Sequence, residues 1–159
     1  MYQTHPIPPL YNSESKVLIL GSFPSVKSRE IAFFYGHPQN RFWKVISSLV
    51  NSPLPQTQKE KTDLILNNKL ALWDVIGGCE ITGSSDTSIK NVKPNDIGEI
   101  LANSKVDRIF VNGKTAEKYY IRYIEPVIGK KAVCLPSTSP ANAAWSVDRL
   151  ISAWAQIFE

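Results

Sequence analysis

The chain has 159 residues, of which 43% are hydrophobic, and its 18 basic and 14 acidic side chains give a net charge of +4. This length and apolar content predict one globular domain over residues 1–159, and the mild positive charge favours an anionic partner such as nucleic acid. Two cysteines and two histidines exclude a four-cysteine iron–sulfur cluster within one chain, and a zinc site would need an improvised ligand set.

The sequence shows neither a signal-peptide h-region nor an apolar run of about 18 residues. We therefore expect a soluble, intracellular protein of the prokaryotic, cytoplasmic type that acts as a monomer, without a metal or a cofactor. Cys134 lies in the apolar run Ala132–Leu135, where a buried free thiol is the expected state and a disulfide with Cys79 is the alternative.

The first half of the chain alternates short apolar runs with helical patterns. Val17–Leu20 has the length and composition of a strand. Phe42–Val50 and Gln58–Asn67 follow, with apolar residues at helical spacing. Leu70–Ile76 is the second apolar run and is predicted to be the second strand.

The second half begins with a segment, Gly77–Lys93, that lacks apolar periodicity and is long for a connection. We expect a functional or mobile loop there. Pro94-Asn95-Asp96 opens a helix with Ile97, Ile100 and Leu101 on one face. The remaining predicted elements are a strand at Arg108–Val111, a helix at Thr115–Glu125, a strand at Ala132–Leu135 and a last helix from about Ala141 with the stripe Val147, Leu150, Ile151, Trp154 and Ile157.

The alternation of strands and helices predicts an α/β fold. Continuous apolar strands are typical of a sheet covered on both faces, and right-handed crossovers make the strands parallel. We expect a three-layer α/β/α sandwich with a central, mostly parallel four-stranded sheet. Ligands of such sheets bind at the carboxyl ends of the strands. These ends are Gly21–Ser25, Trp73–Gly78, Asn112–Lys114 and Pro136–Ser139.

The first polar motif, Gly21-Ser22-Phe23-Pro24-Ser25, follows the first strand. It lacks the second glycine and the Gly-Lys-Ser/Thr ending of a P-loop, and no dinucleotide-binding glycine pattern follows a strand. A turn shaped by glycine and proline exposes backbone N–H groups, which favours binding of a ligand. An ordinary turn at the end of a strand is the alternative.

The second motif, Tyr35–Trp43, combines an aromatic ring, a proline-rigid turn and the start of a helix. Tyr35 lies outside the helical stripe, so its ring is available to a pocket. Asn40 precedes the helix and is either a helix cap or a polar group for chemistry. Phe42 and Trp43 are interpreted as core residues, and His37 as a residue that fixes the loop by a hydrogen bond.

The third motif, Leu135–Asn142, leads from the last strand into the last helix. Three consecutive hydroxyls at Ser137, Thr138 and Ser139 suit a phosphate, although serine-rich turns are also common helix caps.

Together these three motifs resemble the uracil-DNA glycosylase superfamily over most of the chain. The segment His37–Ile46 is similar to that of the mismatch-specific uracil glycosylases, and Leu135–Ala143 is similar to the DNA-intercalating loop of the hypoxanthine-DNA glycosylase branch. The superfamily often places Asp or Asn third in the first motif, where it handles the attacking water, and this chain has Phe23 there. In the hypoxanthine branch an asparagine of the second motif takes that role, which maps to Asn40.

The resemblance implies a DNA repair enzyme that flips a base out of the duplex and hydrolyses its glycosidic bond. The loop lacks the apolar wedge of its relatives, so Pro140 or Ala141 would intercalate. The catalytic residue is then Asn40, the base-binding residues are Gly21, Ser22, Phe23, Tyr35 and Asp74, and the DNA-binding residues are Ser25, Ser28, Ser137, Thr138, Ser139 and Asn142.

Asp74 stands where the resemblance implies that uracil glycosylases keep a base-reading asparagine. An ionised carboxylate only accepts hydrogen bonds, and hypoxanthine offers an N1–H where adenine has a lone pair. We therefore expect Asp74 to favour the deaminated purine, with a cap of a turn or helix as the alternative interpretation.

The predicted function is removal of a deaminated base from DNA: hypoxanthine first, with uracil and xanthine as further substrates. The alternative is a non-catalytic nucleic-acid-binding module that kept the fold and lost the chemistry, which Phe23 favours. A serine esterase is a third interpretation, but the chain lacks a Gly-x-Ser-x-Gly elbow, and only His5 or His37 could serve as its base.

Overall fold

The computed structural model describes residues 1–159 and contains a central parallel sheet. Its strands are β2 (Val17–Gly21), β3 (Leu70–Asp74), β6 (Arg108–Asn112) and β7 (Val133–Leu135), in the spatial order β3-β2-β6-β7. All three neighbouring pairs are parallel. The predicted four-stranded parallel sheet is therefore confirmed.

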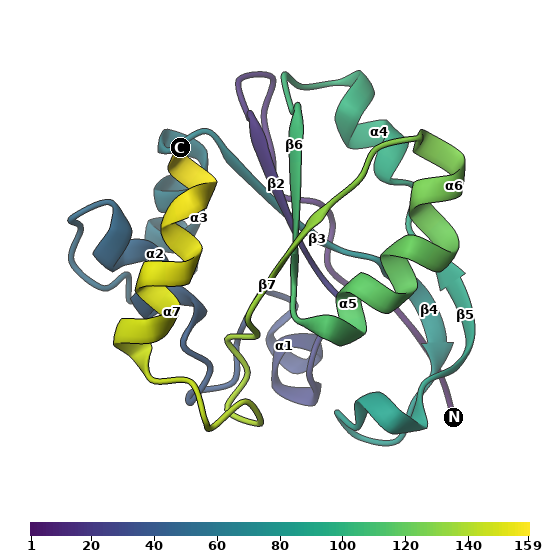
Figure 1. Ribbon diagram of the computed structural model, residues 1–159. Helices are drawn as coiled ribbons and strands as arrows, with labels where there is room; N and C mark the ends of the chain where they lie inside the picture. The colour runs from purple at the N-terminus through teal and green to yellow at the C-terminus, as the bar shows by residue number, and fades with distance from the viewer.

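Helices cover both faces of this sheet, which confirms the predicted three layers (Figure 1). One group is α2 (Phe42–Leu49), α3 (Gln58–Asn67) and α7 (Val147–Trp154), and the other is α4 (Ile97–Ala102), α5 (Lys114–Tyr119) and α6 (Glu125–Ile128). A π-helical turn at Tyr120–Ile124 joins α5 to α6, so the predicted helix at Thr115–Glu125 forms but is irregular.

The core explains why these elements form. The middle residues of β2 have no exposed surface, because helices pack on both of its faces. Phe42 of α2 meets Trp154 of α7 edge-to-face with ring centroids 5.8 Å apart, and both side chains are completely buried. This contact fixes the start of α2, and with it the second polar motif, against the sheet.

A second, antiparallel sheet corrects the prediction for Gly77–Lys93. It consists of β1 (Tyr2–Thr4), β4 (Ile76–Glu80) and β5 (Lys90–Pro94), in the order β1-β4-β5. The segment is thus a hairpin with a single 3₁₀ turn, Asp86–Ser88, near its tip. Glycines in β4 and exposed polar residues in β5 hide the alternation on which a strand prediction depends.

Three further boundaries differ from the predictions. The apolar run Leu70–Ile76 contains two strands, because the chain leaves the parallel sheet at Asp74 and enters the antiparallel one at Ile76. A short helix, α1 (Val26–Ile31), follows the first motif. The last helix begins at Val147 and not near Ala141, because the Ser146 side chain caps it by accepting from the backbone N–H of Arg149.

The hairpin tip, α1 and the loop after β7 lie at one end of the molecule (Figure 1). This end holds the carboxyl ends of the parallel strands. The last turn of the chain is a 3₁₀ helix at Ala155–Phe158. All of the helices fall short of the length and apolarity that a bilayer-spanning helix requires.

Candidate active site

A cavity of about 1030 Å³ opens at the carboxyl end of the parallel sheet. This is where ligands bind in open α/β sheets. The tip of the β4–β5 hairpin and the end of β6 also contribute to its wall. The cavity brings together every residue that the sequence predicted for the site: Gly21, Ser22, Phe23, Ser25, Ser28, Tyr35, Asn40, Asp74, Ser137, Thr138, Ser139 and Asn142.

Gly21, Tyr35 and Asp74 converge at what we call the floor of the cavity. A methyl group at Gly21 would overlap the Asp74 carboxylate and lie 3.4 Å from the Tyr35 hydroxyl. Only glycine leaves room for both groups at this point. The absence of a side chain at Gly21 therefore lets the turn after β2 form part of the floor.

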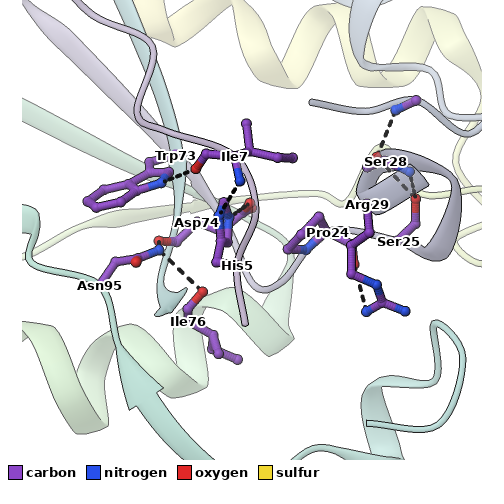
Figure 2. Close-up of polar contacts among 11 residues, drawn as sticks. His5, Ile7, Pro24, Ser25, Ser28, Arg29, Trp73, Asp74, Ile76 and Asn95 are labelled. Carbon is purple, nitrogen blue, oxygen red and sulfur yellow. Dashed lines mark hydrogen bonds and ion pairs between the residues drawn. The ribbon is translucent and has the colours of Figure 1, made fainter. Parts of the chain in front are cut away.

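His5 holds the Asp74 carboxylate from behind (Figure 2). Its Nε2 lies 2.7 Å from Asp74 Oδ2, and the two side chains are 3% and 7% exposed. The other ring nitrogen, Nδ1, accepts from the backbone N–H of Ile7 at 3.2 Å. Sequence reasoning missed this residue as part of the site, because the two partners are 69 residues apart in the chain.

Tyr35 adopts a left-handed backbone conformation, with φ of 51°, and stacks on Phe42 with ring centroids 4.0 Å apart. Its hydroxyl accepts a hydrogen bond from Asn112 Nδ2 at 3.3 Å. Burial, and after it the negative charge of Asp74, raises the pKa of Tyr35 well above its usual value. Tyr35 therefore stays neutral and presents a fixed ring, as the sequence predicted that it would present one to a pocket.

Phe23 is the third residue of the first motif, and its surroundings are aromatic and cationic. The ring meets His5 edge-to-face at 5.9 Å, and the Arg29 guanidinium lies 5.4 Å from its centroid. The backbone N–H groups of Ser22 and Phe23 have no acceptor within the protein. Both donors are thus free to bind a ligand in the cavity.

Asn40 contacts the start of α2 through the oxygen of its amide and leaves the amide nitrogen without a protein partner. Its Oδ1 accepts from the backbone N–H of Phe42 at 2.9 Å, which satisfies a donor at the start of α2. No protein acceptor binds its Nδ2, and the residue lines the cavity. His37 fixes the preceding turn as expected, because its Nδ1 accepts from the backbone N–H of Gln39 at 3.1 Å.

Arg41 organises residues 136–145, which we call the rim loop. Its Nη2 donates to the carbonyl oxygens of Ser139 at 2.8 Å and Asn142 at 3.0 Å. Its Nε and Nη1 donate to the carbonyls of Thr138 and Trp145. One guanidinium thus gathers four carbonyls, a role that the sequence does not reveal because it exists only once the loop has folded.

The structure corrects part of the predicted phosphate contacts. Ser28 and Thr138 are 2% and 0% exposed, so neither side chain reaches a phosphate. Ser28 Oγ accepts from the backbone N–H of Gly36 at 2.8 Å, and Thr138 Oγ1 accepts from Asn112 Nδ2 at 3.0 Å. Ser25 caps α1 by accepting from the backbone N–H of Ser28. These three hydroxyls brace the loops that form the cavity.

The other predicted DNA-binding residues, Ser137, Ser139 and Asn142, lie on the rim loop and are half-buried. Ser137 Oγ and Ser139 Oγ accept from backbone N–H groups two residues further along the chain, and Asn142 Nδ2 donates to the carbonyl of Ser137 at 3.0 Å. Asn112 was not among the predicted site residues. It follows the same rule as Asp74, since both are polar residues at the end of a buried strand.

The thiols and acidic groups form no further centre. Both cysteines are free, Cys79 buried and Cys134 half-buried, so the disulfide alternative is wrong and Cys134 is more accessible than predicted. Burial raises the pKa of both thiols. The structure contains no group of three or more His, Cys, Asp or Glu side chains that would hold a metal ion.

Comparisons with known proteins agree with this architecture. Residues 8–157 match the Uracil DNA glycosylase superfamily. A protein from Methanosarcina barkeri named hypoxanthine DNA glycosylase is 31% identical over 159 residues, with 96% of each chain covered. A protein of the same name from Methanosarcina acetivorans is 31% identical over 156 residues, with 95% of each chain covered. The solution structure of a candidate uracil DNA glycosylase from M. acetivorans has a TM-score of 0.83 at 29% identity, and the match covers 99% of this chain and 97% of that one.

Proposed function

This chain belongs to the uracil DNA glycosylase superfamily and is a monofunctional DNA glycosylase, and we propose that its substrate is hypoxanthine in DNA. The observation that carries the proposal is the Asp74 carboxylate in the floor of the cavity, which accepts hydrogen bonds and donates none. The name of the two relatives at 31% identity supports the same substrate. Uracil and xanthine remain candidate substrates, because each also carries a ring N–H.

The flipped base enters the cavity beside Tyr35 and Phe23. Stacking of a base on an aromatic ring contributes about 1–3 kcal/mol. Phe42 supports the Tyr35 ring from behind, so this surface keeps its orientation when the base arrives. Extrusion is required because the glycosidic bond of a stacked base is out of reach of an active site.

Cleavage of the glycosidic bond gives an oxocarbenium-like sugar and an anionic base. Ser22 and Phe23 line the cavity, and their N–H groups, which have no acceptor within the protein, stabilise this negative charge in the proposed mechanism. Asn40 orients the attacking water through the amide group that the protein leaves unbonded. The water oxygen bonds to C1′ of the sugar, the C1′–N bond to the base breaks, and the proton that the water loses balances the negative charge of the departing base. An abasic site remains in an uncut strand.

The rim loop contacts the DNA next to the flipped nucleotide. Ser137, Ser139 and Asn142 place polar groups there, and Lys114 adds a positive charge at the end of β6. Pro140, which is half-buried, or Ala141, which is exposed, would serve as the wedge that replaces the extruded base. We further propose that the chain acts as a monomer, since one chain supplies all of these groups.

The proposal is tested by measuring base release from duplex and single-stranded oligonucleotides that carry one deoxyinosine, deoxyuridine or deoxyxanthosine. Wild-type protein should release hypoxanthine fastest under single-turnover conditions. Asn40→Ala should lower that rate constant by about 10²- to 10³-fold, because the water loses its orientation. Asn40→Asp is the matched control, since its carboxylate still accepts from the backbone N–H of Phe42.

Two outcomes would favour other functions. If wild-type protein binds these duplexes but releases no base, the chain is a non-catalytic nucleic-acid-binding module. If Asn40→Ala lowers only the melting temperature and excises normally, Asn40 is a helix cap and nothing more. The esterase interpretation has no support, because both ring nitrogens of His5 bond to groups other than a serine and the His37 ring bonds to the backbone N–H of Gln39.

A further inference from the structure

The buried pair of His5 and Asp74 joins the two sheets of the molecule. Asp74 ends β3 of the parallel sheet. His5 follows β1 of the antiparallel sheet, and its backbone N–H donates to the carbonyl of Gly77 in β4 at 2.9 Å. The antiparallel sheet therefore delivers His5 to the back of the cavity floor.

The hydrogen bonds of His5 fix its tautomer. The backbone N–H of Ile7 can only donate, so Nδ1 of the ring must carry a lone pair. The proton of the neutral ring is then on Nε2 and points at Asp74 Oδ2, 2.7 Å away. An imidazolium ion would direct its Nδ1–H at the Ile7 N–H, so the site favours a neutral histidine that donates one hydrogen bond.

This arrangement leaves a single free acceptor in the floor. Asp74 Oδ2 is engaged by His5, whereas the protein provides no donor to Oδ1. Oδ1 lies against the Cα of Gly21, and Asp74 lines the cavity. The atom is not sealed in the interior, since no buried polar side-chain atom lacks a hydrogen-bond partner.

Further hydrogen bonds surround the pair (Figure 2). Trp73 Nε1 donates to the carbonyl of Ile7 at 3.0 Å, which anchors the segment that carries His5. Asn95 Nδ2 donates to the carbonyls of Asp74 at 2.9 Å and Ile76 at 3.2 Å. Both partners are thus held by their backbones as well as by each other, as a discriminating site requires.

We propose that His5 is a positioning residue that turns Asp74 into a selective acceptor for bases with an N–H at the purine N1 position. Its donated bond fixes the carboxylate so that only Oδ1 faces the cavity. A base with N1–H, such as hypoxanthine, satisfies Oδ1, whereas a base with a lone pair at N1 is repelled. The inference rests on the proposed function and names the device that selects the deaminated purine over adenine.

The test compares His5→Leu with His5→Gln. Both variants lose the acceptor for the Ile7 N–H, but the glutamine amide keeps a donor near the position of Nε2. Single-turnover rate constants are measured on duplexes with deoxyinosine and with deoxynebularine, whose purine base has a lone pair at N1. His5→Leu should lower the ratio of the two rate constants by about 10-fold, and His5→Gln should restore most of it.

A ratio is the decisive readout, because a merely structural role of His5 would lower both rate constants together. An unchanged ratio in His5→Leu, or an equal loss in both variants, overturns the inference. If His5→Leu fails to fold, ¹⁵N NMR of the wild-type imidazole decides the point, with a His37→Gln sample for assignment. The Nε2–H tautomer is expected at the pH of activity, and an Nδ1–H tautomer or an imidazolium ion overturns the inference. Failure of the wild-type protein to release hypoxanthine would instead contradict the proposed function.

Discussion

The floor of the cavity and the rim loop are held in different ways. In the floor, buried and half-buried side chains bond to other side chains: His5 to Asp74 and Asn112 to Tyr35. In the rim loop, main-chain carbonyls gather around the single guanidinium of Arg41. The floor therefore depends on the donor or acceptor identity of individual atoms, whereas the rim loop depends on one central cation. Changes in the floor should alter which base is released, and changes at Arg41 should alter how firmly DNA is held.

The two regions are also coupled by one side chain. Asn112 Oδ1 accepts from the backbone N–H of Thr138 at 3.0 Å, and its Nδ2 donates to both the Thr138 hydroxyl and the Tyr35 hydroxyl. The rim loop is thus tied to the floor at its first turn and to α2 by Arg41. Substitutions that remove the hydrogen bonds of one region and leave those of the other test whether the two regions have separate roles.

Among substitutions that separate the floor from the rim loop, the largest effect is expected from Asp74→Asn. The asparagine oxygen still accepts from His5, which leaves its amide group as a donor opposite the N1–H of hypoxanthine. A buried donor without a partner costs about 1–3 kcal/mol, so the single-turnover rate for hypoxanthine should fall about 10- to 100-fold. The hypoxanthine-to-uracil rate ratio should change as well, and affinity for undamaged duplex should stay at the wild-type level.

Asp86→Asn is the matched control for charge. Asp86 lines the same cavity from the hairpin tip but is exposed, so its replacement removes one negative charge without touching the floor. Its rate ratios should equal those of the wild type. If Asp74→Asn keeps the wild-type hypoxanthine-to-uracil ratio, Asp74 does not read the base.

Arg41→Leu is expected to have a smaller effect, which is on DNA affinity and not on the choice of base. Four carbonyls of the rim loop lose their common donor, and the loop samples other conformations. Affinity for a duplex with 2′-fluoro-deoxyinosine, which resists cleavage, should fall about 10-fold, roughly the free energy of one hydrogen bond to a charged group. The ratio of hypoxanthine to uracil excision should stay constant, as fluorescence anisotropy and base release together can establish.

Arg149→Leu controls for loss of a positive charge near the same loop. The Arg149 side chain is exposed, donates to the carbonyl of Ala144 at 3.3 Å and lies over the Trp145 ring at 4.1 Å. It therefore contacts only the last two residues of the rim loop, whereas Arg41 also holds Thr138, Ser139 and Asn142. Arg41→Lys should behave like Arg41→Leu, because an ammonium group cannot reproduce the planar fork of a guanidinium. Equal losses from Arg41→Leu and Arg149→Leu would mean that charge, and not loop geometry, holds the DNA.

The parallel sheet was predictable from sequence, and the antiparallel one was not. Helices cover both faces of the strands at Val17–Leu20 and Arg108–Val111. Burial on both faces requires continuous apolar runs, and such runs identify strands in the sequence. Gly77 and Gly78 instead allow close approach of neighbouring groups, which removes apolar side chains from β4. A strand that contains small residues does not show the alternation of apolar and polar side chains by which strands are predicted.

The same reasoning explains which site residues could be found. Tyr35 and Asn40 belong to one contiguous motif, so local sequence signals were sufficient. His5 and Asn112 act through contacts with residues far away in the chain, and such contacts depend on the topology. Ser28 shows the opposite error, because a serine after a turn was interpreted as a phosphate contact whereas folding buries its hydroxyl.

Ser28→Ala tests that correction and should have the smallest effect on catalysis. The substitution leaves the backbone N–H of Gly36 without its acceptor, directly after Tyr35 in the chain. An unsatisfied buried donor lowers the free energy of unfolding by about 1–3 kcal/mol, which urea denaturation can measure. The salt dependence of DNA binding should stay unchanged, because Ser28 does not touch a phosphate.

Ser48→Ala is the control for this last prediction, since Ser48 is exposed on α2 and its hydroxyl makes no hydrogen bond within the protein. If Ser28→Ala instead lowers the slope of DNA affinity against salt at unchanged stability, the hydroxyl reaches the phosphate backbone after all. In that case α1 must move when DNA binds. DNA binding would then change the position of Tyr35 in the floor. Only His5 and Asp74, whose backbones are hydrogen-bonded to the sheets, would keep their positions whether or not DNA is bound.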